Sequence, residues 1–418
     1  MLRKYDVIIV GAGPAGTACA LYLLKVGLKP LIVERESFPR YHIGESLSGE
    51  CGNCLRELGL ETQIQAINWP VKYGVTVYGA GAQNSFWVPV QKRNRENRLE
   101  PTFTWQVRRS DFDQMLLETA IQRGADVVAG KAIAPIVEGD VVKGLHYRTA
   151  DGSIADVYSD VLVDASGQAT FLASKSNLTS KKESGKYNRQ VAIFTQVKNA
   201  QRDAGDAAGN TLIFTQKPYH WGWFIPLDEA VTSVGVVVPA DYLKAANLSR
   251  EDFLRNELRT LNPEMSRRLP DLNFLEPVRA ISSYSYHVRE FTGKGFLCVG
   301  DAHRFIDPIF SFGVYFAVKE AALAAQAIQQ VMAHERSPSG NPFAEYQALV
   351  EQGQDVIQDL LDCFWTQPLA FLIFAHYQYR EGMIDLFAGR IYDADVAAQP
   401  LVKALRQRLK VESIGSPT

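Results

Sequence analysis

The segment YDVIIVGAGPAG, Tyr5 to Gly16, decides the fold. Its first half is a short apolar run typical of a buried strand, and its second half has the spacing GxGxxG. The apolar-periodic stretch Thr17 to Val26 follows and predicts a helix. Gly11 permits the tight turn, Gly13 lets the backbone approach a diphosphate, and Gly16 lets helix and strand pack closely. Strand, turn and helix together predict a Rossmann-like, dinucleotide-binding α/β domain.

A second apolar strand, Lys29 to Val33, ends in Glu34. An acidic residue about 20 residues after the glycines is placed to bind ribose hydroxyls. Two later strands end in small or acidic residues, the first in VDASG at Val163 to Gly167 and the second in Gly300-Asp301. The Asp301 carboxylate would therefore lie beside the cofactor, where a ribityl hydroxyl can bind it. These segments favour FAD over NAD as the dinucleotide.

Two further segments are expected to reach the cofactor. Arg108 or Arg109 precedes a helix in VRRSDFDQML, and the alternative for either arginine is a salt bridge at the helix start. An Ala-rich helix begins near Phe312 and Gly313, and its N-terminus carries a partial positive charge. Its free N–H groups suit a small anion, and the plainer alternative is a capped helix with a glycine for close packing.

Size and composition exclude several classes of protein. The chain has 418 residues, 46% of them hydrophobic, and a formal charge of −2, which gives no basic field for nucleic acid. Five scattered cysteines do not form a disulfide framework, and the CxxC at Cys51 and Cys54 has no partner motif for a metal site. No apolar run reaches transmembrane length, so we expect a cytoplasmic protein without a membrane role.

One family resemblance rests on FPRYHIGESL at Phe38 to Leu47, on DAHRFIDPIFSFGV, and on two tryptophans in HWGWFIP, His220 to Pro226. Together these segments resemble the flavin-dependent halogenases of the phenol and pyrrole type, in the superfamily of aromatic hydroxylase-like FAD flavoproteins. The similarity runs to about residue 330. Tryptophan halogenases carry a glutamate that serves as an acid/base residue where this chain has Phe310. No residue of this chain obviously takes that role.

The resemblance implies a set of binding residues. Chloride or bromide would lie near the backbone N–H groups of Phe312 and Gly313. FAD would be held by Gly11, Gly13, Ala15, Gly16, Glu34, Arg35, Arg40, Ile43, Gly44, Ser46, Arg109, Asp301, Pro308, Gly313 and Val314.

In this family a lysine hands over the halogen, and the matching residue is Lys72 in NWPVKYGVTVYG. As one strand from Val71 to Tyr78, this stretch would point Lys72 away from the valines, beside a glycine that leaves empty space. The alternative is an ordinary solvated lysine.

Trp221 and Trp223 stand two residues apart, so in a strand both indoles would lie on one face. The resemblance implies that they separate the flavin pocket from the substrate pocket. The alternative is a large core pair that supports a sheet.

The resemblance implies a reaction in which FADH2, O2 and halide give hypohalous acid, which passes the tryptophans and meets Lys72. An electron-rich aromatic substrate, either phenol, pyrrole or indole and either free or carrier-tethered, then takes the halogen. Only one dinucleotide site is visible, so we expect a separate NAD(P)H-dependent flavin reductase as partner.

The chain divides into three expected regions. A discontinuous FAD-binding domain would comprise residues 1–65, 104–185 and 276–330. A β-sheet substrate domain would comprise residues 66–103 and 186–275, because these carry period-2 patterns rich in valine and aromatics. Residues 331–418 are expected to be helical, and their aromatic stretch either closes the substrate pocket or docks a carrier protein.

Three rival functions stay open. An FAD-dependent aromatic hydroxylase would share the fold but differ in how the flavin pocket is separated from the substrate pocket. A geranylgeranyl-reductase-like enzyme has a similar tryptophan and proline spacing but no role for Lys72. A flavin-binding sensor without turnover has no use for a lysine behind two tryptophans.

Overall fold

The computed structural model of the chain describes residues 4–80, 85–282, 285–333 and 340–415. The outer ends of the expected first and last regions, 1–3 and 416–418, lie outside the described residues. Among the described residues, the structure has no helix with the length and apolar character needed to cross a membrane.

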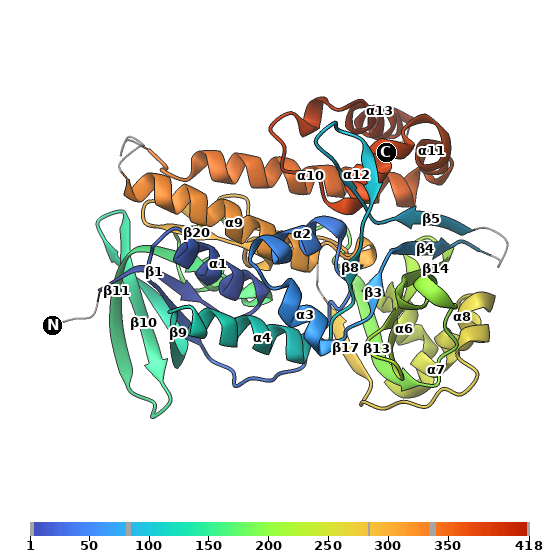
Figure 1. The fold of residues 1–418 in the computed structure, drawn as a ribbon, viewed down its shortest axis with the longest axis horizontal. Coiled ribbons are helices and arrows are strands. Elements are labelled where there is room, and N and C mark those ends of the chain that lie inside the picture. Colours follow the sequence, from blue (N-terminus) through green and yellow to red (C-terminus); the bar gives the residue numbers. More distant parts are fainter. Residues whose placement is uncertain (1–3, 81–84, 283–284, 334–339, 416–418) are drawn as a thin grey trace.

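The first sheet is the predicted dinucleotide-binding sheet. Its parallel strands run in the order β9, β2, β1, β11, β20, and β19 pairs antiparallel with β20. Val10 lies opposite both Val33 and Asp164, so the carboxyl ends of three strands meet at one edge. The strands are β1 Lys4–Val10, β2 Pro30–Glu34, β9 Asp126–Glu138, β11 Ile154–Asp164, β19 Thr292–Gly293 and β20 Phe296–Cys298. Beyond the parallel part, β9 and β11 continue as an antiparallel meander with β10, Val141–Thr149 (Figure 1).

Helices lie alongside this sheet (Figure 1). The helix after the glycine turn begins earlier than predicted, because Pro14 suits a first helical turn. It packs against α9 and α4. The helices are α1 Pro14–Lys25, α2 Gly49–Glu57, α3 Glu61–Ile67, α4 Arg109–Gln122, α5 Phe171–Lys175 and α9 Gly313–Met332.

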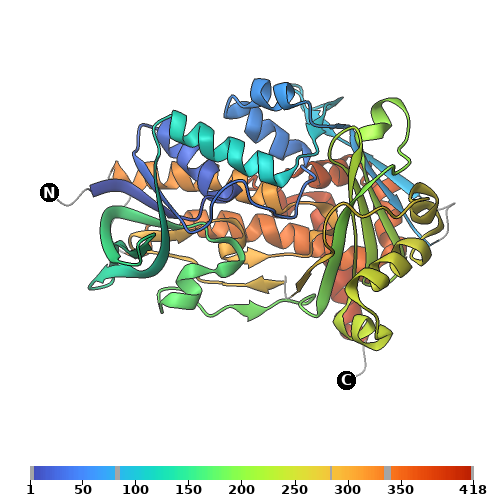
Figure 2. The same ribbon diagram turned by 90° about the horizontal axis from the view of Figure 1, so that it is seen from below.

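The second sheet has seven strands in the order β17, β13, β16, β15, β14, β4, β5. One face carries Phe224 and packs on α7 and α8, while the other carries Trp221 and Trp223 and joins the main core. The strands are β4 Gly74–Tyr78, β5 Ser85–Pro89, β13 Gln190–Lys198, β14 Thr211–Lys217, β15 His220–Pro226, β16 Val231–Pro239 and β17 Arg279–Ser282. The helices beside it are α6 Ala240–Ala246, α7 Arg250–Thr260 and α8 Pro263–Arg268. Because β17 belongs to this sheet, one strand comes from the range 276–330 that the sequence assigned to the FAD-binding domain. Figure 2, which turns the molecule by 90°, shows this second sheet standing beside the first.

Short strand pairs complete the connections. They are β3 Val71–Lys72 with β8 Thr104–Trp105, the hairpin of β6 Gln91–Arg93 and β7 Leu99–Pro101, and β12 Glu183–Ser184 with β18 Tyr286–His287 and β21 Arg304–Phe305.

The C-terminal region is helical, as predicted, and lies at the top of Figure 1 in red. It comprises α10 Ala344–Thr366, α11 Pro368–Ile373, a π-helical turn Phe374–Gln378, α12 Arg380–Ala388 and α13 Pro400–Gly415.

Candidate active site

The glycine turn is fixed by close backbone contacts. Gly11 has φ +102°, and a Cβ there would lie 2.7 Å from the carbonyl oxygen of Ala165. A Cβ at Gly16 would lie 1.9 Å from the carbonyl oxygen of Gly11. At Gly13 the nearest atom to a Cβ would be the Arg40 guanidinium at 3.5 Å, so the surface above this glycine is open. Buried Ala15 follows in the first turn of α1, where free N–H groups attract a diphosphate.

Glu34 closes the end of β2 beside this turn. Its two carboxylate oxygens accept hydrogen bonds from Ala12 N at 2.6 Å and Glu36 N at 2.7 Å. These bonds fix the carboxylate next to the turn, and its remaining lone pairs suit ribose hydroxyls. Arg35 is exposed and pairs with Glu36 at 3.3 Å, so its side chain is not held at the turn.

Asp301 follows β20 at the same edge of the sheet. Burial raises the pKa of its carboxyl to about 7, and nearby Arg109 acts in the opposite direction. Within the described residues its carboxylate makes no hydrogen bond or ion pair, so it is available to a ligand. The turn that carries it is held by Glu320 of α9, which accepts from Gly300 N at 2.7 Å and bonds His303 Nε2 at 3.0 Å.

Arg109, and not Arg108, is the arginine that meets the loop before α2. Arg109 is 5% exposed, binds Asp113 at 2.7 and 2.9 Å, and donates to the carbonyl oxygen of Ile43 at 2.6 Å. Arg108 reaches instead to Asp228, between β15 and β16, at 2.6 Å. Arg109 therefore forms a salt bridge at the helix start, the alternative given above, and also contacts the loop at residues 43–44.

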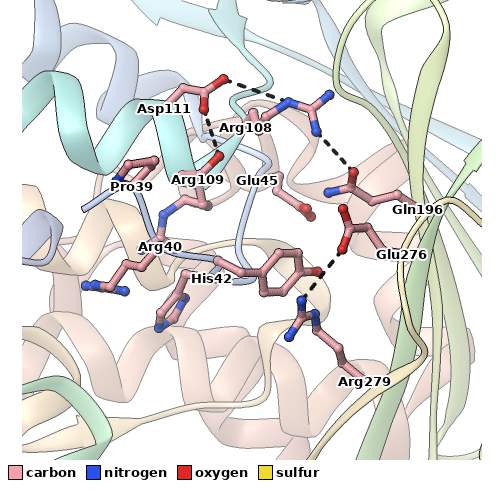
Figure 3. A pocket seen from close by; sticks show the side chains of 12 residues that line it. Pro39, Arg40, His42, Glu45, Arg108, Arg109, Asp111, Gln196, Glu276 and Arg279 are labelled. Atoms are coloured by element: carbon pink, nitrogen blue, oxygen red, sulfur yellow. Dashed lines mark hydrogen bonds and ion pairs between the residues drawn. The ribbon is translucent and has the colours of Figure 1, made fainter. Parts of the chain in front are cut away.

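A cavity of about 240 Å³ lies between this loop, the start of α4 and the second sheet (Figure 3). The open glycine turn, the free Asp301 carboxylate and this cavity lie along one side of the sheet edge, and they fit an extended dinucleotide such as FAD. The cavity is lined by Pro39, Arg40, Tyr41, His42, Glu45, Arg108, Arg109, Ser110, Asp111, Gln196, Glu276 and Arg279.

Lys72 is buried, with 2% of its surface exposed. Its Nζ donates to Ser46 Oγ and to the carbonyl oxygen of Leu47, both at 2.8 Å. Burial lowers the pKa of the amine to about 7, partly offset by the Cys51 thiol. At neutral pH the site therefore holds both ammonium and free amine.

The prediction of one continuous strand around Lys72 is wrong. Asn210 Oδ1 accepts from the N–H groups of Tyr73 and Gly74, both at 2.9 Å, where the stretch divides into β3 and β4. The expected empty space beside Gly74 is also wrong, because a Cβ there would lie 2.2 Å from the exposed Trp87 ring.

The lowered pKa of Lys72 predicts a pH-dependent stability. Between about pH 7 and the ordinary value of 10.5 the unfolded chain binds a proton at this lysine that the folded chain does not. Stability contributed by this residue therefore rises with pH, by up to about 1.4 kcal/mol per unit. We expect the difference in free energy of unfolding between wild type and Lys72→Met to shift in favour of wild type from pH 7 to pH 9. Urea titrations followed by tryptophan fluorescence measure this, and a constant difference contradicts the lowered pKa.

The two tryptophans lie on one face of β15, as predicted. Their ring centroids are 5.8 Å apart, and both side chains are buried. Gly235 stands opposite Trp223 because a Cβ there would lie 2.3 Å from the indole. Trp223 Nε1 donates to Ser233 Oγ at 3.1 Å, whereas Trp221 Nε1 has no partner among the described residues.

Glu45 is a site residue that sequence reasoning missed. It is 1% exposed, it lines the cavity, and its side chain is hydrogen-bonded by Ser233, the residue that also bonds Trp223. Burial raises the pKa of its carboxyl to about 7, and its Oε2 has no partner within the described part of the chain. Ser46 follows Glu45 directly, and its Oγ accepts from Lys72. Residues 45 and 46 therefore connect the lysine, through Ser233, with Trp223. The lone acid in the quoted stretch HIGESL was the available signal.

We expect Glu45→Gln and Glu45→Ala to behave differently. A glutamine keeps an acceptor for Ser233, whereas alanine leaves the Ser233 and Trp223 pair without one. Alanine should lower halogenated product per FADH2 consumed about five- to tenfold, the effect of about one hydrogen bond, with glutamine close to wild type. Product and peroxide measured from the same reactions give the ratio, and equal behaviour of the two variants contradicts the link.

The start of α9 has open space beside Gly313. Ser311 has φ +61°, Phe312 precedes the helix, and a Cβ at Gly313 would meet nothing within 4 Å. The first N–H groups of a helix have no partner within it. Pro308 and Val314 lie on either side, the first half-buried and the second buried.

The chain is similar to known flavoproteins over most of its length. Residues 4–346 match the model of the FAD binding domain family. The chain is 38% identical over 405 residues to the 1H-pyrrole-2-carbonyl-[peptidyl-carrier protein] brominase of Pseudoalteromonas luteoviolacea, covering 96% of this chain and 95% of that protein. It is 30% identical to the corresponding chlorinase of Pseudomonas fluorescens, covering 93% and 90%. The solved structure of the flavin-dependent brominase Bmp2 matches with a TM-score of 0.91 at 36% identity, covering 99% of this chain and all of that one.

The fold, the glycine turn and these relatives point the same way. The chain belongs to the flavin-dependent halogenases and carries their FAD-binding domain.

Proposed function

We propose that the protein installs chloride or bromide on an electron-rich aromatic acyl group, of the pyrrole type, that is carried as a thioester on a carrier protein. Two relatives whose names state such a substrate support this choice. The observation that carries the proposal is a buried amine, Lys72, joined through Ser46 and Glu45 to a pair of buried tryptophans.

FAD, when bound in its reduced form, supplies hypohalous acid from O2 and halide. The residues that would hold it are those of the glycine turn with Glu34, Asp301 and Arg109. The open position at Gly313, at the positive end of α9, would bind the halide. A separate NAD(P)H-dependent flavin reductase would supply FADH2, since the match covers a single dinucleotide-binding domain.

The chain's own residues then control the oxidant. Trp221 and Trp223 would keep the aromatic substrate away from the flavin, and their burial excludes water that would consume the oxidant. Lys72 holds the halogen either as an ammonium that hydrogen-bonds to hypohalous acid or as an amine that becomes a haloamine with loss of water. In both cases the ring carbon gains the halogen and loses a proton, and the oxygen leaves as water. The position of the ring beside the amine supplies much of the rate.

The division into an FAD-binding domain (1–65, 104–185 and 276–330), a substrate domain (66–103 and 186–275) and a helical region (331–418) remains part of this proposal. The two sheets and the C-terminal helices support it, except at β17, which lies within 276–330 but belongs to the second sheet.

Mass spectrometry of reactions with enzymatically regenerated FADH2 tests the function. We expect halogenated product with chloride or bromide from a pyrrole-2-carbonyl thioester, and no product without halide. A hydroxylated product in halide-free buffer at the same rate would instead indicate a hydroxylase. Reduction of FAD by the purified protein and NADPH alone would contradict the need for a reductase.

A further inference from the structure

The C-terminal region reaches the carboxylate that holds the turn after β20. Glu320 of α9 is fully buried, and its Oε2 accepts from Gly300 N and His303 Nε2, as described above. Its Oε1 accepts from Gln354 Nε2 at 2.6 Å and from the hydroxyl of Tyr392 at 2.9 Å. Gln354 lies on α10, and Tyr392 lies in the segment between α12 and α13. Donors from three separate parts of the chain therefore meet at one buried carboxylate.

The four donors match what a carboxylate can accept. Its two oxygens offer about four lone-pair positions, and each oxygen of Glu320 receives two hydrogen bonds. A buried charge that loses such partners is costly, since solvent does not replace them. Gln354 is itself fully buried, and its Oε1 has no partner in the part of the chain that the structure describes. An unpaired amide oxygen in the interior is unfavourable, and the hydrogen bond that this amide donates to Glu320 offsets that cost.

The backbone of this turn is fixed on both sides of Asp301. Gly300 has φ +61°, and a Cβ there would lie 3.3 Å from Cα of Ala317 on α9. His303, at the other end of the turn, is fully buried. The carbonyl oxygen of Asp301 accepts from the hydroxyl of Tyr286 at 2.6 Å. These contacts set the place from which the Asp301 carboxylate can reach a ligand.

Helix α10 also contacts the chain just before and just after the turn. The hydroxyl of Tyr346 donates to the carbonyl oxygen of Cys298 at 2.9 Å, and Arg304 Nη1 pairs with Asp355 at 2.7 Å. The helix packs against α9, which carries the buried carboxylate (Figure 1). Asp355 and the two C-terminal donors lie beyond residue 346, where the match to the FAD binding domain ends. Residues outside the matched domain therefore help to hold this turn.

We propose that Gln354 and Tyr392, acting through Glu320, are positioning residues for the turn after β20 and make the C-terminal region part of the flavin site. This inference rests on the proposed contact between Asp301 of that turn and the ribityl chain of FAD. A carboxylate that is already in place binds a ligand without a further cost of ordering. When the two donors are lost, the turn is no longer held in one position, and FAD has to order it on binding. If the donors only stabilised the fold, their loss would weaken the binding of every ligand alike.

The test compares FAD with ADP, which has the diphosphate and ribose of FAD but no ribityl chain. We expect Gln354→Met and Tyr392→Phe each to raise the Kd for FAD about fivefold or more, since each removes a hydrogen bond to a buried charge. The Kd for ADP should not change, because the glycine turn and Glu34 are untouched. Isothermal titration calorimetry with the full-length protein measures both. Gln358→Met is the matched control on the same helix, since its amide bonds Asp362 within α10, and it should change neither Kd.

Two results overturn the inference. One is an unchanged Kd for FAD in either variant, and the other is an equal loss of affinity for FAD and ADP, which indicates a general loosening of the fold. Thermal unfolding with and without FAD gives an independent readout, because a ligand that binds more tightly raises Tm further. We expect the rise in Tm caused by FAD to be smaller in both variants than in wild type, and an unaltered rise contradicts the positioning role. If Gln354→Met fails to fold, Tyr392→Phe, which removes one oxygen atom, decides the question.

Asp301→Ala separates this inference from the role of Asp301 itself. If that variant binds FAD as wild type does, the proposed cofactor contact fails, and the inference fails with it. If it binds FAD more weakly while Gln354→Met and Tyr392→Phe do not, only the inference fails. Neither titration contains an aromatic substrate, so a failure of the proposed halogenation would leave these results unaltered.

Discussion

Lys72→Ala should abolish halogenated product, by about 10²- to 10⁴-fold, while FADH2 continues to be oxidised to give peroxide. The reason is the position of the amine. It is buried, it donates to Ser46 Oγ and to the Leu47 carbonyl oxygen, and burial lowers its pKa to about 7. Halogenated product by mass spectrometry and peroxide by a coupled assay, taken from one reaction, measure both effects.

The control variants separate chemistry from folding. Lys72→Met keeps most of the side-chain volume and removes the amine, so it should lose product as alanine does while FAD affinity stays at the wild-type value. Lys131→Ala, at an exposed lysine of β9, should change neither measurement. Full halogenation by Lys72→Ala would remove the lysine from the reaction.

Local signals were enough to predict the dinucleotide sheet, because the constraints on its turn lie within a few residues. Gly11 and Gly16 are required by backbone contacts beside the turn itself. The alternation of the β15 tryptophans is also a local property, since successive strand residues point to opposite faces. These features need no knowledge of the rest of the chain.

Contacts between distant segments could not be predicted in this way. The strand divides after Lys72 where Asn210 binds two backbone N–H groups more than 130 residues earlier in the chain. Trp87 fills the space at Gly74 from the neighbouring strand. Glu45 matters because Ser233 bonds both it and Trp223. Side-chain partners of this kind depend on which distant segments become neighbours in the fold, and local sequence periodicity does not show this.

Trp221→Ala should uncouple the enzyme, raising peroxide per halogenated product about tenfold. Trp221 is 3% exposed, and its ring extends the surface that Trp223 begins on the same face of β15. If the indoles form the proposed partition, removing one would leave a cavity through which water and substrate could approach the flavin. The uncoupling is measured as halogenated product, peroxide and any hydroxylated aromatic formed in the same reaction.

Loss of a buried tryptophan also costs about 3–5 kcal/mol, so a conservative pair of variants is needed. Trp221→Phe removes an N–H that has no partner among the described residues, whereas Trp223→Phe takes a donor away from Ser233. The second variant should therefore be less stable by about 1–2 kcal/mol, while the first keeps nearly wild-type stability. If the tryptophans form a partition, coupling follows the size of the side chain at 221, with tryptophan best, phenylalanine intermediate and alanine worst. If they only support the sheet, coupling stays constant among the folded variants and only stability changes.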